Sequence, residues 1–290
     1  MAKILNGKIV RDKIAEKLKK EIKELNGSVE LAVIQIGDRV DSSAYIEQKK
    51  KFGEMVGAKV VHLRFEETVK ESEIISEIVR LNEDILVNGI ILQLPIPKHL
   101  SSTNIIGKID PKKDVDGLTA ENVKKLIQND SSGMIPATAR GIISLLNFYK
   151  ISVVGKKVVI VGRSLLVGKP TAMALLNRNA TVTICHSKTK NIEEITKLAE
   201  IVIMAVGKPE FFGKKYFKKG QVIVDVGINM KTGKKLNEEI PNTKFVGDVN
   251  FDEVKGIVKA ISPVPCGVGP MTVASLFENL LDAYLKQKRM

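Results

Sequence analysis

Short apolar runs alternate along the chain with stretches in which apolar residues recur every three or four positions. The first runs are LAVIQIG (31–37), AKVVHLRF (58–65) and GIILQLPIP (89–97). Such runs are typical of strands buried on both faces, and the stretches between them have the period of amphipathic helices. Strand, helix and strand in this order predict parallel strands joined by crossover helices.

A second series of the same kind follows a loop-rich stretch. It predicts four more buried parallel strands, in the runs VVIVG (158–162), TVTICH (181–186), IVIMAVG (201–207) and QVIVDVG (221–227). The chain ends in a Gly/Pro-rich loop and a long amphipathic helix. We expect this helix to return and pack on the first domain.

The length of the chain suits two domains. Its 290 residues, 44% of them apolar, are many for one core and enough for two. The boundary falls between about residues 136 and 154, where the loop-rich stretch ends. We therefore predict an α/β protein with an N-terminal α/β catalytic domain (1–138 plus 270–290) and a C-terminal Rossmann-like domain (139–269).

Composition narrows the classes of function. The net charge of +13 suits anionic partners, but lysines and glutamates are interleaved and only nine Phe and four Tyr could stack on bases, which disfavours nucleic-acid binding. No apolar run is long enough to span a membrane, and the N-terminus lacks a signal-peptide core. Two cysteines without a CxxC motif and three scattered histidines predict no metal site and indicate a reducing cytoplasm.

One lysine stands on the apolar side of a predicted helix. In SSAYIEQKKKFGEMVG (42–57), Lys49 falls on the stripe formed by Tyr45, Phe52 and Val56. Lys49 is compatible with a snorkelling side chain whose ammonium reaches water. It is also compatible with a cleft-lining lysine whose pKa is lowered by desolvation, which is useful for proton transfer.

Polar residues also follow the third predicted strand. Gln93 stands at its carboxyl end, where ligands of open parallel sheets bind. Asp114 and Asp116 lie in the following KKDVDGL segment. Each has a structural alternative, because Gln93 can satisfy loop backbone and the aspartates can cap turns.

The segment VVIVGRSLLVGKP predicts a strand, a glycine turn and a helix. Gly162 and Gly168 flank Arg163 and Ser164, and such a turn presents backbone amides to a phosphate at a helix N-terminus. The full GxGxxG pattern is missing, so a corner without a ligand remains an alternative.

The next predicted strand ends in HSKT rather than in the acid that binds the ribose of NAD. Ser187 together with Arg163 would accept a 2′-phosphate, which favours NADP. The alternative is that Ser187 caps the helix KNIEEITKLAE and Arg163 is a surface residue. The turns AVGKP (205–209) and DVGIN (225–229) would bring backbone near the cofactor.

Taken together, these segments resemble the bifunctional methylenetetrahydrofolate dehydrogenase/cyclohydrolases over essentially the whole chain. The matching pieces, in order, are GDRVDSSAYIEQKKK, GIILQLPIP, PKKDVDG, GRSLLVGKP, HSKT, VGKP, VDVGIN, VGDV and PVPCGVGPMT.

The resemblance implies a role for each polar residue of the first domain. Lys49 is the catalytic lysine, and Gln93 hydrogen-bonds it and tunes it. Tyr45 contacts the folate, and Asp116, which matches better than Asp114, binds the amino edge of the pterin. We further hypothesise that Gln93 and burial together lower the pKa of Lys49.

The resemblance also implies the cofactor and substrate contacts of the second domain. The residues expected to contact NADP are Gly162, Arg163, Ser164, Gly168, Ser187, Gly207, Ile228 and Thr272. The segment PVPCGVGPMT (263–272) is expected to close over both substrates, with folate contacts from Pro263, Pro265 and Gly267. Cys266 replaces a glycine of many relatives, and Ala137 and Ala139 replace the outer residues of a Cys-Thr-Pro motif.

The implied activity is oxidation of methylenetetrahydrofolate with NADP⁺, followed by hydrolysis of the methenyl product to formyltetrahydrofolate. The implied protein is a cytoplasmic homodimer that binds tetrahydrofolate derivatives, with or without polyglutamate tails, and no nucleic acid or membrane. Alternatives stay open at this point. The nearest is a monofunctional dehydrogenase. From another class come an NADP-binding module without chemistry and a basic nucleic-acid-binding protein.

Overall fold

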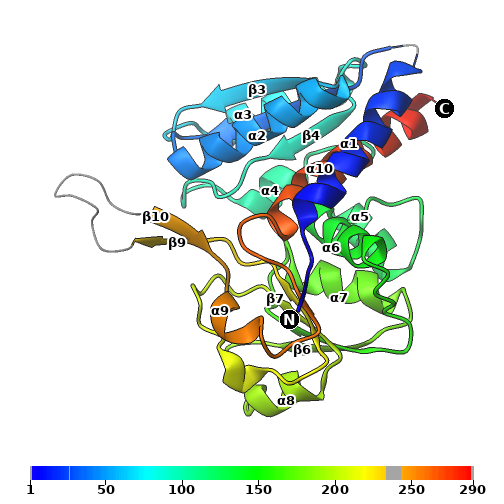
Figure 1. The fold of residues 1–290 in the computed structure, drawn as a ribbon. Helices are drawn as coiled ribbons and strands as arrows, with labels where there is room; N and C mark the ends of the chain where they lie inside the picture. The colour runs from blue at the N-terminus through cyan, green and yellow to red at the C-terminus, as the bar shows by residue number, and fades with distance from the viewer. Residues whose placement is uncertain (1, 26, 233–242, 289–290) are drawn as a thin grey trace. The chain divides into compact units, whose positions relative to one another are not determined.

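The computed structural model describes residues 2–25, 27–232 and 243–288 (Figure 1). The chain forms two compact units, each made of two segments. Unit 1 consists of Met1–Arg11 and Thr138–Thr272, and unit 2 consists of Asp12–Ala137 and Val273–Met290. The predicted fold class, a two-domain α/β protein with parallel sheets, is confirmed.

The N-terminal segment differs from the predicted division. Unit 2 corresponds to the predicted first domain, and unit 1 corresponds to the predicted second domain. The sequence assigned residues 1–11 to the first domain, but the structure groups them with unit 1. The cause is a strand pairing, because β1 (Lys3–Ile4) lies parallel to β11 (Ala260–Ile261) at the edge of the unit 1 sheet. Such a short strand carries no pattern that could reveal its distant partner.

Unit 2 is built on a parallel sheet. In the described residues its strand order is β3-β2-β4, with β2 (Glu30–Ile36) in the centre, β3 (Lys59–Phe65) on one side and β4 (Gly89–Leu92) on the other. Every residue of β2 and β4 is buried, as their continuous apolar runs predict. The connections are α2 (Val40–Val56) and α3 (Glu71–Glu83).

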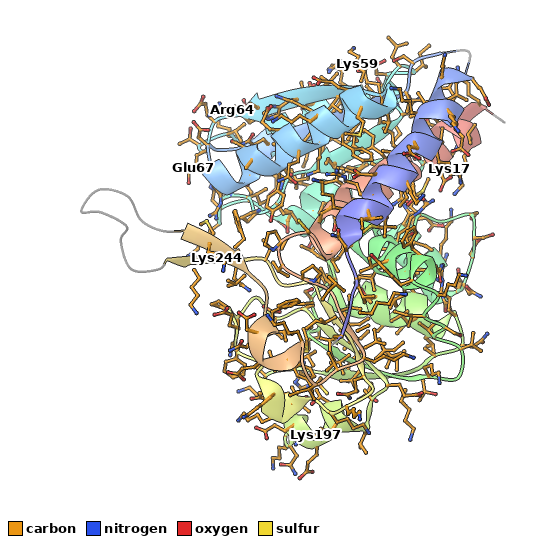
Figure 2. The ribbon with its side chains drawn as sticks, viewed as in Figure 1. Lys17, Lys59, Arg64, Glu67, Lys197 and Lys244 are labelled. Carbon is orange, nitrogen blue, oxygen red and sulfur yellow. The ribbon has the colours of Figure 1, made fainter. Side chains whose placement is uncertain are left out.

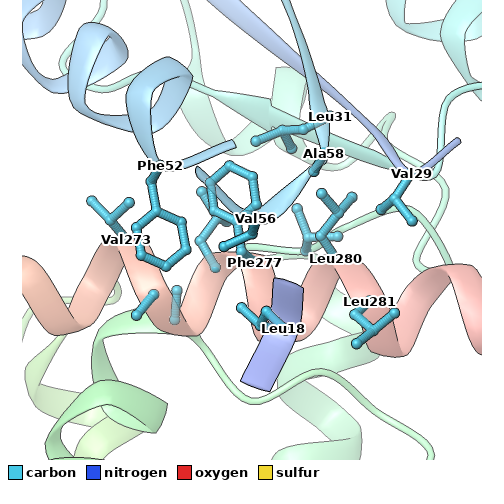
Figure 3. Close-up of a cluster of buried hydrophobic side chains, with 14 of the residues drawn as sticks. Leu18, Val29, Leu31, Phe52, Val56, Ala58, Val273, Phe277, Leu280 and Leu281 are labelled. Carbon is cyan, nitrogen blue, oxygen red and sulfur yellow. The ribbon is translucent and has the colours of Figure 1, made fainter. Parts of the chain in front are cut away.

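The C-terminal helix completes the core of unit 2. Phe277 of α10 (Val268–Lys288) is fully buried, and its ring lies 5.1 Å from that of Phe52 on α2. Figure 3 shows the Phe52 side chain reaching from α2 toward Phe277 on α10, with Leu18 of α1 (Gly7–Lys23) in the same cluster. The predicted return of this helix onto the first domain is therefore confirmed.

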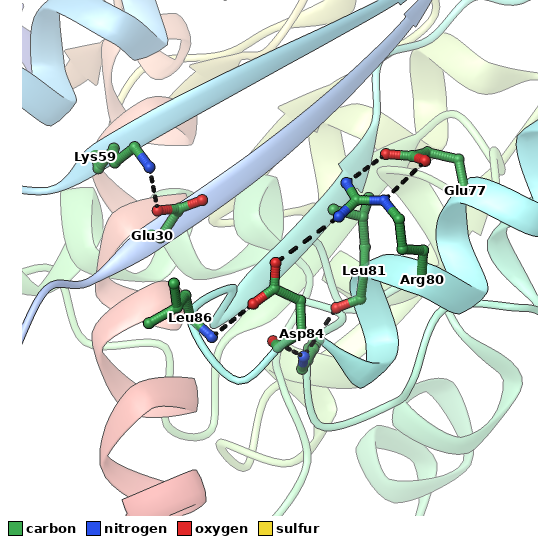
Figure 4. A network of polar contacts seen from close by, with 8 residues as sticks. Glu30, Lys59, Glu77, Arg80, Leu81, Asp84 and Leu86 are labelled. Carbon is green, nitrogen blue, oxygen red and sulfur yellow. Dashed lines mark hydrogen bonds and ion pairs between the residues drawn. The ribbon is translucent and has the colours of Figure 1, made fainter.

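The rest of unit 2 follows the sheet as short helices and loops. Their bounds are α4 (Ser102–Ile106), α5 (Ala120–Ile127) and the start of α6 (Ala137–Phe148). A polar network closes the end of α3, where Arg80 bonds Glu77 and lies 3.9 Å from Asp84 (Figure 4). Asp84 also accepts a bond from the Leu86 amide and so shapes the turn into β4.

Unit 1 contains the larger sheet. Its order in the described residues is β1-β11-β8-β7-β5-β6, and all of the pairs are parallel. The central strands are β5 (Lys157–Val161), β6 (Thr181–Cys185), β7 (Ile201–Met204) and β8 (Val222–Asp225). The short elements around them are α7 (Gly168–Leu176), α8 (Ile192–Leu198), a 3-10 turn η1 (Lys214–Tyr216), α9 (Phe251–Val254) and the ribbon of β9 (Asn229–Thr232) and β10 (Thr243–Val246).

This strand order creates a topological switch point. From β5 the chain moves outward to β6 and then crosses back to β7 on the other side of β5. Connections therefore leave the carboxyl ends of β5 and β7 in opposite directions. Open α/β sheets bind their ligands at such a point.

Phe277 provides a test of how far unit 2 depends on α10. Replacing it with alanine removes a fully buried ring, and we expect unit 2 to lose about 3–5 kcal/mol of stability. Urea unfolding followed by hydrogen exchange of unit 2 peptides measures this loss. Ile85→Ala, at a side chain that is 88% exposed, should change little. Equal effects of the two variants would contradict this account of the core.

Candidate active site

Lys49 and Gln93 meet in unit 2. The Lys49 ammonium donates a 2.6 Å hydrogen bond to Gln93 Oε1. Lys49 is carried by α2, whose inward face also holds the buried Ile46, Phe52 and Val56. The snorkelling alternative is therefore wrong, because the ammonium is turned to a polar partner inside the unit rather than to water.

The orientation of the Gln93 amide is fixed by the strand end. Its backbone amide continues the sheet by donating to Ile34 O at 2.8 Å. Its side-chain Nε2 donates to Leu94 O at 2.9 Å, which leaves Oε1 to face the lysine. Gln93 thus satisfies loop backbone and binds Lys49 at the same time, so the two roles weighed from the sequence coexist.

Burial lowers the pKa of the Lys49 ammonium below its ordinary value, and the nearby Asp116 carboxylate opposes this effect. The hypothesis that Gln93 also lowers this pKa is wrong in its physical reasoning. An amide oxygen that accepts a bond from an ammonium group favours the charged form. Gln93 orients the Lys49 ammonium, and desolvation lowers its pKa.

Asp116 forms the acidic counterpart of Lys49. Burial raises the pKa of its carboxyl to about 6, the Lys49 charge lowers it and the Asp114 charge raises it further. A lysine that is pushed toward neutrality therefore stands near an acid that is pushed toward protonation. Opposite shifts of this kind in one place are a mark of functional sites.

Asp114, in contrast, has a structural role, because it holds the turn that follows it. Its carboxylate accepts bonds from the amides of Leu118 (3.1 Å) and Thr119 (2.7 Å) and from Asn122 Nδ2 (2.9 Å). This is the turn-capping role weighed from the sequence. With both oxygens of Asp114 occupied, the structure favours Asp116 as the group left for a ligand.

Sequence reasoning missed the residues that hold the Asp116 loop. Asn279 of α10 is buried and donates to Val115 O at 2.8 Å and Ile135 O at 2.9 Å. Lys113 donates to Leu81 O and Asp84 O at the end of α3. The one available signal was Asn279 itself, a polar residue in the apolar stripe of the last helix.

Tyr45 precedes Lys49 by one helical turn and is half-buried. Residues four apart in a helix share a face, so both side chains belong to the same side of α2. The contact of Tyr45 with the folate stays a prediction.

In unit 1 the predicted phosphate turn follows β5. Gly162 has φ +131°, and a Cβ there would lie 2.1 Å from Ala205 O. A Cβ on Gly168 would lie 2.2 Å from Gly162 O, so both positions need glycine. The Ser164 hydroxyl accepts bonds from the amides of Val167 (3.1 Å) and Gly168 (3.3 Å) and holds the turn together.

Arg163 and Ser187 follow neighbouring strands, β5 and β6, and both are exposed. The capping alternative for Ser187 is wrong, because the N-cap position of α8 is occupied by Asn191. A guanidinium and a hydroxyl at adjacent strand ends fit a phosphate on the cofactor ribose.

The turn after β7 is open. Gly207 has φ +69°, and an added Cβ would meet nothing within 4 Å. A ligand could therefore approach this backbone closely. The tight Gly162 turn and the open Gly207 turn lie at the ends of the paired strands β5 and β7, so the residues of unit 1 fit a dinucleotide.

The remaining predicted contacts lie further along unit 1. Ile228 is exposed, and its Cδ1 would lie 3.2 Å from a Cβ on Gly269. Thr272 Oγ1 is 3.5 Å from Thr138 Oγ1. Cys266 has φ +77°, a backbone conformation that favours glycine. The ligand contacts of Ile228, Thr272, Pro263, Pro265 and Gly267 stay predictions.

Metal and membrane features were examined over the described part of the chain. Within residues 2–25, 27–232 and 243–288, no group of three or more His, Cys, Asp or Glu is placed to hold a metal ion. No helix in the same ranges has the length and apolar character needed to cross a membrane.

Basic side chains are spread over the surface of both units. Figure 2 labels Lys17, Lys59 and Arg64 in unit 2 and Lys197 and Lys244 in unit 1. Several pair with acids, as Lys59 does with Glu30 at 2.7 Å. Arg64 likewise pairs with Asp38. Paired and dispersed charges form a solvated surface rather than a nucleic-acid stripe.

Comparison with known proteins identifies the family. The model of the tetrahydrofolate dehydrogenase/cyclohydrolase NAD(P)-binding domain matches residues 136–288, and that of the catalytic domain matches residues 5–116. The chain belongs to this family. The resemblance inferred from the sequence is therefore confirmed.

Individual relatives agree over the full length. The bifunctional protein FolD of Thermodesulfovibrio yellowstonii is 44% identical over 100% of this chain and 99% of its own. The crystal structure of the bifunctional FolD enzyme of Campylobacter jejuni superposes with a TM-score of 0.92 at 38% identity over 100% of both chains. The Trypanosoma brucei FolD structure, complexed with NADP and an inhibitor, has a TM-score of 0.93 at 32% identity over 100% of this chain and 99% of its own.

Gly162→Ala tests the phosphate turn. The added methyl group would collide with Ala205 O, so we expect NADP⁺ to bind at least about tenfold more weakly, a loss of about 1.4 kcal/mol. Titration calorimetry measures the change. Gly155→Ala is the matched control, because Gly155 also has positive φ (+69°) but an added Cβ there meets nothing within 4 Å. Equal weakening by both variants would show that backbone strain, and not the turn, is responsible.

Asp116→Asn tests the cost of the buried acid. The folded-state pKa of about 6 exceeds the ordinary 3.8, so the folded protein holds the proton longer and wild-type stability falls as pH rises from about 4 to about 6. Asparagine removes this cost, and we expect a gain on the order of 1 kcal/mol at about pH 7 that vanishes near pH 4. Urea unfolding of unit 2 at both pH values measures the gain.

Asp130→Asn is the control with the opposite sign. Hydrogen bonds to Ser132 lower the pKa of the exposed Asp130, so its contribution is present at neutral pH and is lost as pH falls. A stability gain at neutral pH from both substitutions would indicate a general charge effect.

Proposed function

We propose that this protein oxidises 5,10-methylenetetrahydrofolate to 5,10-methenyltetrahydrofolate with NADP⁺ and then hydrolyses the product to 10-formyltetrahydrofolate. Family membership and full-length similarity to bifunctional relatives support both reactions. The observation that carries the second reaction is the Lys49–Gln93 bond beside Asp116. A monofunctional dehydrogenase has no need of a lysine tuned in this way.

The cofactor, when bound, accepts the hydride that leaves the methylene carbon. The residues of unit 1 that would hold it are Gly162 and Gly168, which let backbone amides approach a phosphate, and Arg163 with Ser187, which would bind the ribose phosphate. This last pair favours NADP over NAD. The NADP bound in the Trypanosoma brucei relative supports the same choice.

In the hydrolysis, water adds to the cationic methenyl carbon, a ring C–N bond breaks and a proton is released. Lys49 is suited to take a proton from the attacking water and pass it to the leaving nitrogen, because burial raises the fraction of its neutral amine. Gln93 holds Nζ in place for both transfers. Asp116, at the same place, would accept bonds from the pterin amino edge, and Tyr45 would contact the folate ring.

The setting of the reaction completes the proposal. A protein of this kind would act in the cytoplasm as a homodimer, on folates with or without glutamate tails, and the many surface lysines would attract such polyanions. Dispersed and paired charges disfavour the nucleic-acid alternative. Unchanged migration of nucleic acid in the presence of the protein at low salt would dismiss that alternative.

Lys49→Met separates the two reactions. We expect it to lower the rate of methenyltetrahydrofolate hydrolysis by about 10²-fold or more, because it removes the group that moves protons while keeping the volume of the side chain. The wild-type rate should rise with pH through the lowered pKa of Lys49, and the residual rate of the variant should lack this rise. Absorbance of the methenyl compound follows its formation with NADP⁺ or NAD⁺ and its decay.

Lys51→Met, on the exposed face of the same helix, is the matched control and should leave both rates unchanged. Wild-type protein that forms the methenyl product without accelerating its hydrolysis would be a monofunctional dehydrogenase, with Lys49 as a binding residue. Protein that catalyses neither step would overturn the proposal as a whole.

A further inference from the structure

Two buried aspartates stand at the carboxyl edge of the unit 1 sheet, and the functional roles above do not use them. Asp225 is the last residue of β8, and Asp248 follows β10. Their side chains are 3% and 0% exposed. Aspartate is almost never fully buried unless it is paired, so the contacts of the two carboxylates need a physical account.

Asp248 accepts hydrogen bonds from the backbone amides of one turn. Its Oδ2 accepts bonds from the backbone amides of Val206 (2.7 Å) and Gly207 (3.2 Å). Its Oδ1 accepts bonds from the amide of Lys208 (2.8 Å) and from Asn229 Nδ2 (3.0 Å). Three successive amides converge on one carboxylate, as they do around an anion in a backbone nest. The turn after β7 is therefore shaped around an anion that belongs to the protein.

Asp225 holds Asp248 in turn. Its Oδ1 accepts from the amides of Gly227 (2.9 Å) and Asp248 (3.1 Å), and its Oδ2 accepts from the amide of Val249 (2.8 Å). The backbone on either side of Asp248 is thus fixed from the end of β8. Burial and the neighbouring Asp248 charge raise the pKa of Asp225 to about 7.

The glycines beside this pair show how closely the backbone approaches it. A Cβ on Gly247 would lie 1.9 Å from Asp225 Oδ2, and a Cβ on Gly227 would lie 2.4 Å from Asp248 Oδ1. These positions leave no room for a side chain. The sequence pieces VGDV and VDVGIN, which no role above absorbs completely, are accounted for by this packing.

We propose that Asp248 is a positioning residue that holds the Val206–Lys208 turn in the shape that receives the cofactor, and that Asp225 holds Asp248. The proposal rests on the proposed function, in which Gly207 contacts NADP. It also restricts that contact. Because the three amides already bind a carboxylate, they are not available to a cofactor phosphate, so this turn would meet an uncharged part of the cofactor. The phosphates are left to the turn after β5.

Hydrogen exchange of the wild-type protein without any ligand gives the first test. Gly207 and Lys208 are exposed, and exposed turn amides ordinarily exchange fast. Bonding to Asp248 predicts that the amides of residues 206–208 exchange at least about 100-fold more slowly than in an unstructured peptide. Exchange at unstructured rates, measured by NMR, would overturn the proposal.

Asp248→Asn gives the second test. The single side-chain oxygen of asparagine can accept from only one of the two sets of donors, either Val206 and Gly207 or Lys208 and Asn229. The NH₂ group that replaces the other oxygen repels the second set. We expect faster exchange at residues 206–208 and NADP⁺ binding at least about tenfold weaker by titration calorimetry. Asp252→Asn removes the same charge from an exposed side chain in the nearby α9 and should change neither. NADP⁺ affinity unchanged in Asp248→Asn, or equally weakened in Asp252→Asn, would overturn the positioning role.

Asp225→Asn decides the question if Asp248→Asn fails to fold. It leaves Asp248 in place but replaces one oxygen of Asp225 with an NH₂ group. At least one of the backbone amides of Gly227, Asp248 and Val249 then loses its acceptor. We expect faster exchange at residues 206–208 and a loss of NADP⁺ affinity of about threefold to tenfold, and no change in either would overturn the proposal. Failure of the proposed function looks different. Wild-type protein would then bind no NADP⁺ while residues 206–208 remained protected from exchange.

Discussion

A charge removed from water is the constraint on which the candidate site depends. Desolvation of the Lys49 ammonium costs free energy, and the Gln93 oxygen and the Asp116 carboxylate offset only part of it. The unit must therefore hold both partners in place, or the lysine would swing out to solvent. The buried β4, which is followed directly by Gln93, and the core around Phe277 supply the rigidity that keeps Lys49 and its partners in place.

A buried aspartate that accepts hydrogen bonds from backbone amides occurs at two turns. In unit 2, Asp114 accepts two nearby amides and fixes the loop that carries Asp116. In unit 1, Asp248 accepts three successive amides and fixes the turn that carries Gly207. Each aspartate thus fixes the backbone beside a residue, Asp116 or Gly207, that we propose to contact a ligand. A buried carboxylate bonded to backbone amides shapes a loop more firmly than loop packing alone, since breaking the bonds would leave both the charge and the amides unpaired.

Local pattern was enough to predict much of the fold and of the site. Continuous apolar runs located the strands β2 to β8. The prediction that all of them are buried was wrong for β3 and β6, which lie at sheet edges and are only partly buried. The interruption of an apolar stripe by Lys49 pointed to the candidate site before any partner was known. The pairing of β1 with β11 and that of β9 with β10 escaped prediction, because strands of two and four residues are too short to show a periodicity. Asn279, Asp225 and Asp248 escaped for another reason. Their partners are distant in sequence, and only the folded chain brings a side chain to those backbone groups.

The limits of sequence reasoning also explain why one inference about Lys49 failed. From the sequence, Gln93 and burial looked like two causes of the same pKa change. The geometry separates them, because an acceptor 2.6 Å from the ammonium stabilises its charge while burial destabilises it. A lysine held between these opposing effects, with Asp116 on the side of the charged form, loses its proton at a lower free-energy cost than an exposed lysine does. That property is what a group needs if it is to take up and release a proton within one reaction cycle.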